Sequence, residues 1–201
     1  MKIVLRLASY IFHPLWMPFF ASVLYFAITP RYFPPEVIKT KLVGIAIMLL
    51  FIPIVFYFLL RTLGIVKSYF LAEVKERKWP LLFYLFLLSV ILKFVLDIYD
   101  YPELFYYFLG ILVSTFVALF LVFFRIKISL HMLGLGALLM FIISLSLHFA
   151  MNLTFTLGFF LAITGLTATS RLDYKAHSYS ELIFGFFAGF FPQLLMWQFW
   201  L

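Results

Sequence analysis

A group of polar residues near the carboxyl end of the chain could bind and attack a phosphate. It reads Ser170-Arg171, then five residues, His177, then three residues and Glu181. A guanidinium such as that of Arg171 can bind two phosphate oxygens at once. Glu181 follows His177 by four residues, one helical turn, so its carboxylate could accept the ring N–H and orient the imidazole.

Two further polar clusters interrupt the apolar sequence. One contains Lys127, Ser129 and His131, and the other, at residues 73–80, contains Arg77. Lys127 and Arg77 could help to neutralise a phosphate. Ser129 and the first amides of a following helix could donate to its oxygens, because a helix N-terminus favours anions. Of the histidines in these clusters, one could act as a nucleophile and another as a general acid.

The composition requires lipid as the main solvent. Of the 201 residues, 66% are hydrophobic and 11% are charged, and the mean hydropathy is +1.14. An ordinary soluble domain is about half apolar and about a quarter charged. The absence of cysteine excludes disulfides, thiolate catalysis and Cys-ligated metal sites. In a membrane protein, the net charge of +7 indicates how the loops are oriented across the membrane and that they contact anionic headgroups or phosphates. It is not taken as a sign of nucleic-acid binding.

Continuous apolar segments predict an all-α, polytopic transmembrane bundle of six to seven spans, forming one integral-membrane domain over residues 1–201. A span needs about 20 mainly apolar residues. Seven segments meet or approach this length: residues 8–29, 42–63, 81–96, 104–124, 130–150, 153–166 and 182–201. The third and the sixth are short, so one of them could be re-entrant or tilted. The first is interpreted as a retained span bent at Pro18, because no cleavage-site pattern follows a short apolar core.

Seven spans would bring the three polar clusters to one side of the membrane. That side, side A, would carry the N-terminus and residues 64–80, 125–129 and 167–180. Side B would carry residues 30–41, residues 97–103, the turn at Asn152 and the C-terminus. Because the chain returns to side A before each cluster, we expect the clusters to form a single site. No cluster has metal-ligand spacing, so neither a metal nor another cofactor is expected.

The cluster around His177 resembles a signature of the type 2 phosphatidic acid phosphatase (lipid phosphate phosphatase) superfamily, S-R-x5-H-x3-D, with Glu181 in place of Asp. Lys127-Ile-Ser-Leu-His131 is similar to the P-S-G-H signature of that superfamily, reduced to S-x-H. The resemblance covers the chain from Lys127 onward and implies that His177 is the phosphate-accepting nucleophile. It also implies that His131 protonates the leaving group and that Glu181 is the partner of His177. The candidate phosphate ligands are Arg171, Ser129, Lys127, Arg77 and Ser170.

The chain departs from the family pattern at three places. The first signature, K-x6-R-P, is absent as such, and Arg77-Lys-Trp-Pro80 is a loose substitute that stands one hairpin earlier. Ile128 and Leu130 replace the Pro and Gly of the second signature, and Glu181 is longer than Asp by one methylene. Because of these changes, the sequence is also compatible with a site that is altered or inactive.

The resemblance implies an integral-membrane phosphatase that removes phosphate from a lipid phosphate or pyrophosphate without a metal. The alternative is a catalytically inactive relative that binds lipid headgroups or serves as a membrane subunit of a complex. A transporter is disfavoured, because the spans contain no evident charge pair. We expect a protein of the bacterial inner membrane. The Lys and Arg bias favours a cytoplasmic site, the resemblance favours an outward-facing one, and the oligomeric state stays open.

Other conspicuous residues are interpreted as structural. His148 is expected to be a satisfied interior or interfacial histidine, and His13, before Pro14 near side A, is expected to be structural. Gly134-x-Gly136 and Gly185-x3-Gly189 predict close contacts between helices.

Overall fold

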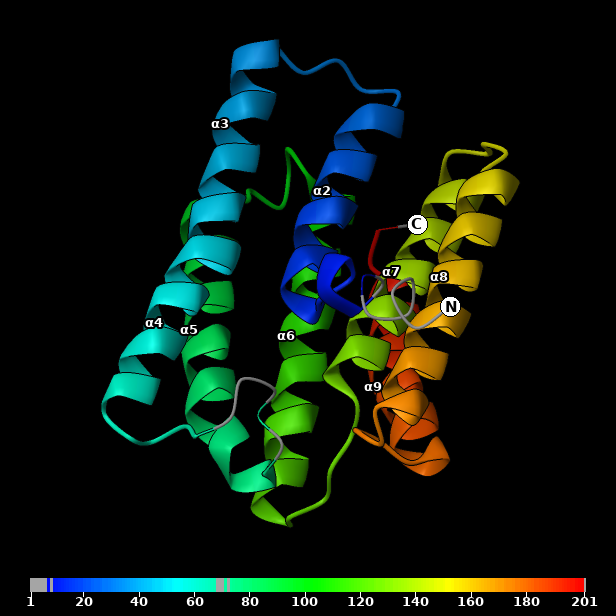
Figure 1. Cartoon of the computed structure of the whole chain (residues 1–201). Coiled ribbons are helices and arrows are strands. Elements are labelled where there is room, and N and C mark those ends of the chain that lie inside the picture. The colour runs from blue at the N-terminus through cyan, green and yellow to red at the C-terminus, as the bar shows by residue number, and fades with distance from the viewer. Residues whose placement is uncertain (1–6, 8, 68–70, 72, 201) are drawn as a thin grey trace.

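The computed structural model describes residues 7, 9–67, 71 and 73–200, and within these residues it contains helices and no strand. The chain runs through η1 (Pro14–Trp16), α2 (Met17–Ile28), α3 (Pro35–Ala46), η2 (Ile47–Phe51), α4 (Ile52–Thr62), η3 (Val74–Arg77), α5 (Lys78–Phe94), α6 (Pro102–Phe123), α7 (Leu130–His148), α8 (Thr154–Asp173) and α9 (Tyr179–Trp197). The all-helical class predicted from the sequence is therefore confirmed (Figure 1).

Five helical segments in the described part of the chain are long and apolar enough to cross a membrane. They are the continuous segment Pro35–Thr62, formed by α3, η2 and α4, together with α6, α7, α8 and α9. The α5 helix has 17 residues and α2 has 12, so both are shorter than an ordinary span. The protein is thus an integral membrane protein, and the count of six to seven spans stays a prediction.

Two predicted boundaries differ from the observed helices. The α8 helix continues to Asp173, whereas the sequence suggested a loop from residue 167, because the polar residues Thr167, Ser170 and Arg171 are buried within the helix and not solvated. The first predicted span is interrupted at His13, where the backbone is extended before Pro14. As a result, α2 begins only halfway along the bundle (Figure 1).

The connections alternate between the two ends of the bundle. Those joining α4 to α5, α6 to α7 and α8 to α9 lie at the lower end in Figure 1, and those joining α2 to α3, α5 to α6 and α7 to α8 lie at the upper end. The lower end corresponds to side A. Three of the four polar segments assigned to side A are thus gathered at one end of the molecule.

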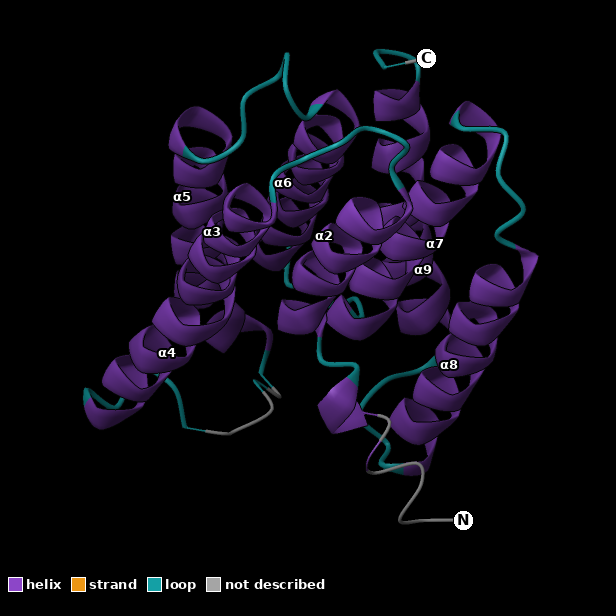
Figure 2. Ribbon diagram, turned by 90° about the horizontal axis from the view of Figure 1, so that it is seen from above, coloured by secondary structure: helices purple, strands orange, loops and turns teal. Residues whose placement is uncertain are grey.

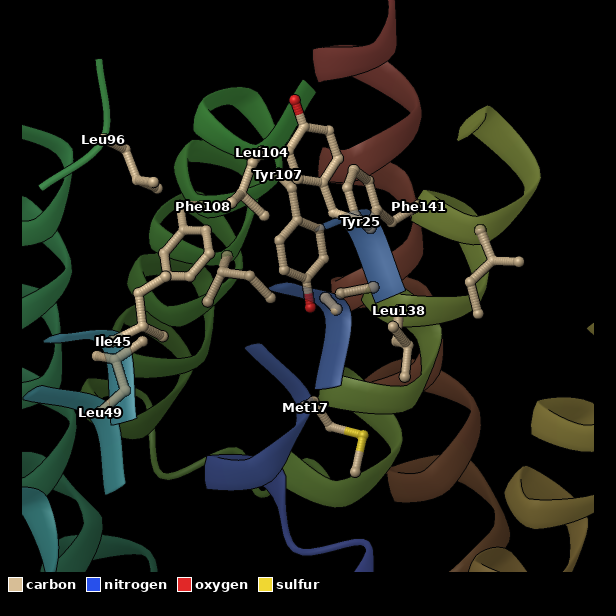
Figure 3. Packing of buried hydrophobic residues seen from close by; sticks show 14 of the residues in the cluster. Met17, Tyr25, Ile45, Leu49, Leu96, Leu104, Tyr107, Phe108, Leu138 and Phe141 are labelled. Atoms are coloured by element: carbon tan, nitrogen blue, oxygen red, sulfur yellow. The ribbon is translucent and has the colours of Figure 1, made fainter. Parts of the chain in front are cut away.

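A buried apolar core surrounds the middle of the bundle. Figure 3 shows Met17 and Tyr25 from α2 near Tyr107 from α6 and Leu138 and Phe141 from α7. The rings of Tyr107 and Phe141 stack with their centroids 4.3 Å apart. The view from above shows α7 between α2, α8 and α9 (Figure 2). Because α7 is enclosed on several sides, its first turn is held firmly.

Glycines allow α7 and α9 to lie in direct backbone contact. A Cβ atom added at Gly189 would overlap the carbonyl oxygen of Leu133, and one added at Gly136 would overlap the carbonyl oxygen of Phe186. A Cβ at Gly185 would lie 2.5 Å from the carbonyl oxygen of Ser129. The close helix contact predicted from these glycines is therefore present. It fixes the starts of α7 and α9, which carry two of the three polar clusters.

We expect Gly189→Ala to destabilise the protein, because backbone atoms of α7 cannot yield to the added methyl group. The free energy of unfolding should fall by about 1–3 kcal/mol, the usual cost of overpacking. Gly158→Ala in α8 is the matched control, since a Cβ there meets no atom within 4 Å. Thermal unfolding of both variants in one detergent measures the difference. Equal melting temperatures would show that α7 and α9 can separate without cost.

The upper end of the bundle is held together by the buried carboxylate of Glu103. Arg31 donates to both of its oxygens at 2.7 and 3.1 Å, and the Tyr25 hydroxyl donates at 3.0 Å. His148 Nε2 lies 3.3 Å from Glu103 Oε1. His148 thus has a structural partner, as interpreted from the sequence, and it lies at the end of α7 opposite the polar clusters.

Candidate functional site

A cavity of about 890 Å³ lies between the start of α2 and the lower end of the bundle. Four basic side chains line it, namely Arg77, Lys127, Arg171 and Lys175, and so do three histidines, His13, His131 and His177. Among the described residues that line the cavity, none is acidic. The basic side chains come from the three polar clusters, which the fold brings to one chamber. Such a chamber attracts an anion.

The remaining walls of the cavity are apolar. They include Pro53, Ile54 and Phe58 from α4 and Phe83 from α5. The π-helical turn η2 precedes Pro53, whose missing N–H cannot continue a regular helical ladder. The chamber therefore presents both a cationic region and a hydrocarbon-like region to one ligand.

His177 and Glu181 form the predicted pair at the start of α9. Ser178 caps this helix by accepting a hydrogen bond from the amide of Glu181. The first turn then places His177 Nδ1 2.6 Å from Glu181 Oε2. Because a carboxylate only accepts, Nδ1 carries the proton and Nε2 keeps its lone pair. No described residue pairs with Nε2, which leaves it available as a nucleophile.

Burial lowers the pKa of the His177 imidazole to about 4. The hydrogen bond to Glu181 opposes this shift, whereas the positive charges of Arg77 and Lys127 act in the same direction as burial. His177 is therefore neutral at physiological pH. A neutral imidazole is the form that can attack an electrophile.

We expect carbethoxylation of His177 by diethyl pyrocarbonate to remain fast down to about pH 5, because this reagent modifies only neutral imidazole. An ordinary imidazole with a pKa of about 6.5 is only about one-tenth neutral at pH 5.5. Peptide mapping by mass spectrometry at several pH values gives the rate for each histidine. A rate at His177 that declines with a midpoint near pH 6.5 would contradict the burial argument.

The same shift makes stability depend on pH in a defined direction. In the unfolded chain His177 takes up a proton below about pH 6.5, whereas the folded protein does not until about pH 4. This group therefore lowers the free energy of unfolding as the pH falls between these values, and it contributes no pH dependence above them.

Arg171 presents a buried guanidinium to the cavity without a partner. Its relative exposure is 6%, and its Nε atom is buried and makes no hydrogen bond. Among the described residues no carboxylate pairs with Arg171. The ring of Tyr174 lies 5.8 Å from its guanidinium carbon, and Tyr10 is also close enough to interact with its charge. A buried charge without a partner is costly. An anionic ligand would remove this cost.

Arg77 and Lys127 are held by backbone carbonyl groups. Arg77 Nη1 donates to Ile128 O at 2.7 Å, and its Nε donates to Leu71 O at 3.1 Å. Lys127 Nζ donates to Ala176 O at 2.7 Å and lies 4.0 Å from Glu181 Oε2. These two side chains therefore join the three polar segments to one another, and they add positive charge at the cavity wall.

His131 lies in the first turn of α7 and lines the cavity. Its Nε2 is 3.2 Å from the carbonyl oxygen of Ser9. Since a carbonyl only accepts, Nε2 is the protonated nitrogen. In the neutral ring Nδ1 then has a lone pair.

Ser129 and Ser170 do not line the cavity. Ser129 is the N-cap of α7, where its hydroxyl accepts from the amide of Met132 and its own amide donates to Glu181 O. The Ser170 hydroxyl is buried and lies 2.6 Å from the hydroxyl of Ser9. Both serines therefore support the elements that carry the site, and their predicted contact with phosphate stays a prediction.

His13 belongs to the cavity although its sequence pattern favoured a structural role. It lies just before η1, and its ring centroid is 5.3 Å from that of His131 with an interplanar angle of 80°. The two residues are 118 positions apart in the chain. Only the folding of α2 against α7 brings them together, so no local spacing could have revealed the pair.

No protein-family model, curated protein or solved structure matches the chain.

Proposed function

We propose that this protein is an integral-membrane phosphatase that acts on a lipid phosphate or pyrophosphate. The observation that carries the proposal is Arg171, a buried and unpartnered guanidinium in a cavity that also holds a neutral, oriented histidine. A guanidinium in this state favours a phosphate, which it can bind bidentately. His177 is then the group able to react with that phosphate.

The apolar walls support an amphiphilic substrate. A cationic region next to Ile54, Phe58 and Phe83 matches a phosphate headgroup attached to a hydrocarbon chain. The volume of about 890 Å³ is also in the range of sites that bind drug-sized ligands. A water-soluble phosphate ester would leave the apolar part of the cavity unused.

In the proposed reaction, the lone pair of His177 Nε2 attacks phosphorus and the bond from phosphorus to the leaving oxygen breaks. The leaving oxygen takes a proton, a step that the family resemblance assigns to His131. Because the Nε2–H of His131 is bonded to Ser9 O, this ring must first accept a proton at Nδ1, for example from a protonated phosphate group of the substrate, and then deliver it to the leaving oxygen. Glu181 holds Nδ1–H and stabilises the positive charge that develops on the His177 ring. Arg171 stabilises the charge on the transferred phosphoryl oxygens. Water then hydrolyses the phosphohistidine and releases phosphate.

Phosphate release by the purified protein in detergent tests this proposal. The panel contains phosphatidate, phosphatidylglycerophosphate, a polyprenyl diphosphate and a soluble phosphate monoester, each with and without a chelator. We expect chelator-resistant release from at least one lipid and little release from the soluble ester. Absence of both release and binding, in protein shown to be folded, would overturn the proposal.

A non-catalytic role in lipid binding is the second candidate, and the position of Ser129 favours it. The hydroxyl and amide of Ser129 are both used within the fold, so the loop that resembles the P-S-G-H signature offers a phosphate fewer donors than the family pattern implies. Stoichiometric binding of a lipid phosphate without turnover would support this candidate against the phosphatase.

A further inference from the structure

The cavity contains a third histidine to which neither the family resemblance nor the proposed reaction gives a role. The imidazole of His13 lines the same chamber as Arg171 and His177, and it meets the ring of His131 edge to face. His13 comes from the segment before η1, near the start of the sequence. The two clusters that resemble family signatures, around His131 and His177, lie in the C-terminal half of the sequence. Its position calls for a chemical explanation.

The hydrogen bonds of His13 fix which of its nitrogens carries a proton. His13 is the N-cap of η1, and its Nδ1 accepts from the amide of Leu15 at 3.4 Å. An accepting Nδ1 has no proton, so the ring is neutral and the proton is on Nε2, at the other edge of the ring. No described residue accepts from this N–H.

His131 also carries its proton on Nε2, but this N–H already has an acceptor within the protein. Its protonated Nε2 donates to the carbonyl oxygen of Ser9, so the neutral ring has no N–H left for a ligand. Of the two adjacent rings, only His13 offers a free donor in the ground state. A phosphate in the cavity would thus find a hydrogen-bond donor at His13 and an acceptor at His131.

We propose that His13 is a phosphate-contacting residue, whose Nε2–H donates to an oxygen of the phosphoryl group held by Arg171. This inference rests on the proposed function, because it assumes that phosphate binds in this cavity. The N-cap bond to Leu15 and the fixed backbone angle of Pro14 hold the ring in place before the ligand arrives. The donor therefore needs little reorganisation on binding.

Imidazole nitrogen NMR tests the contact directly. The chain has only four histidines, so protein labelled with ¹⁵N-histidine gives four imidazole spin systems, which single substitutions assign. We expect inorganic phosphate or vanadate to shift the Nε2–H signal of His13. A shift at His177 without one at His13 would overturn this inference and leave the phosphatase proposal standing. No shift at any histidine would overturn both.

Two substitutions separate the contact with phosphate from the capping role. His13→Asn keeps an acceptor near the position of Nδ1 and loses the distal donor, whereas His13→Gln keeps a donor near the position of Nε2 and loses the cap. We expect phosphate binding to weaken by about 10- to 100-fold in His13→Asn, the effect of losing a hydrogen bond to a charged group. His13→Gln should bind within about threefold of the parent protein. The reverse order of affinities would show that His13 is only a helix cap.

Discussion

His177→Ala is expected to abolish phosphate release, with a loss of about three orders of magnitude or more. The substitution removes the imidazole whose ring is oriented by a carboxylate and whose Nε2 lone pair is free. Because His177 is partly buried and its ring bonds only to Glu181 one turn away, the fold should survive the change. Release of phosphate from the preferred lipid phosphate measures the effect.

Trapping the phosphorylated protein makes this test more specific. Quenching in base during turnover of a ³²P-labelled substrate should leave label on the parent protein and none on His177→Ala, because phosphohistidine survives in base. His148→Gln is the matched control, since it alters a histidine at the opposite end of α7 and keeps a donor near Glu103. If His177→Ala retains full activity, the assignment of the nucleophile is wrong.

Arg171→Met is expected to have opposite effects on binding and on stability. The affinity for phosphate, and any turnover, should fall by about 10²- to 10³-fold, as for the loss of a principal donor to a developing anion. Without ligand, however, the variant should be as stable as the parent protein or more stable, because the unpartnered buried charge of Arg171 is removed.

Arg77→Met provides the contrast. Arg77 is also a buried guanidinium at the cavity wall, but it donates to the carbonyl oxygens of Leu71 and Ile128. Its loss should lower the free energy of unfolding by about 1–3 kcal/mol, because buried acceptors are left unpaired. Thermal unfolding of both variants in ligand-free detergent gives the comparison. If Arg171→Met lowers the melting temperature as much as Arg77→Met does, Arg171 is a structural residue.

The bulk of the fold could be predicted from the sequence, because long apolar segments in lipid must satisfy their backbone polar groups within helices. The helices α6, α7 and α9 begin and end close to the predicted positions, where Pro102, Ser129 and Ser178 stand at or next to the first helical residue. The end of α8 was misjudged. Polarity predicts a loop where side chains are solvated, but the side chain of Arg171 points to an internal cavity.

Some features of the candidate site could likewise be predicted from the sequence, and others could not. The pairing of His177 with Glu181 follows from the sequence, because residues four apart on a helix lie on one face whatever surrounds them. The sequence also carries the glycines that let α7 and α9 touch. These are local properties, and they depend on a few consecutive residues.

Only the tertiary structure decided which polar groups are free to act. Arg77 and Arg171 are alike in the sequence, yet one is held by carbonyl groups and the other is left without a partner. The Ser129 hydroxyl caps α7 and does not line the cavity. His13 lines the cavity because α2 is short and packs against α7, which places the His13 ring beside that of His131. Pairing and burial in the site depend on contacts such as Arg77 with Ile128 and His13 with His131, which are 51 and 118 positions apart and which no local pattern records.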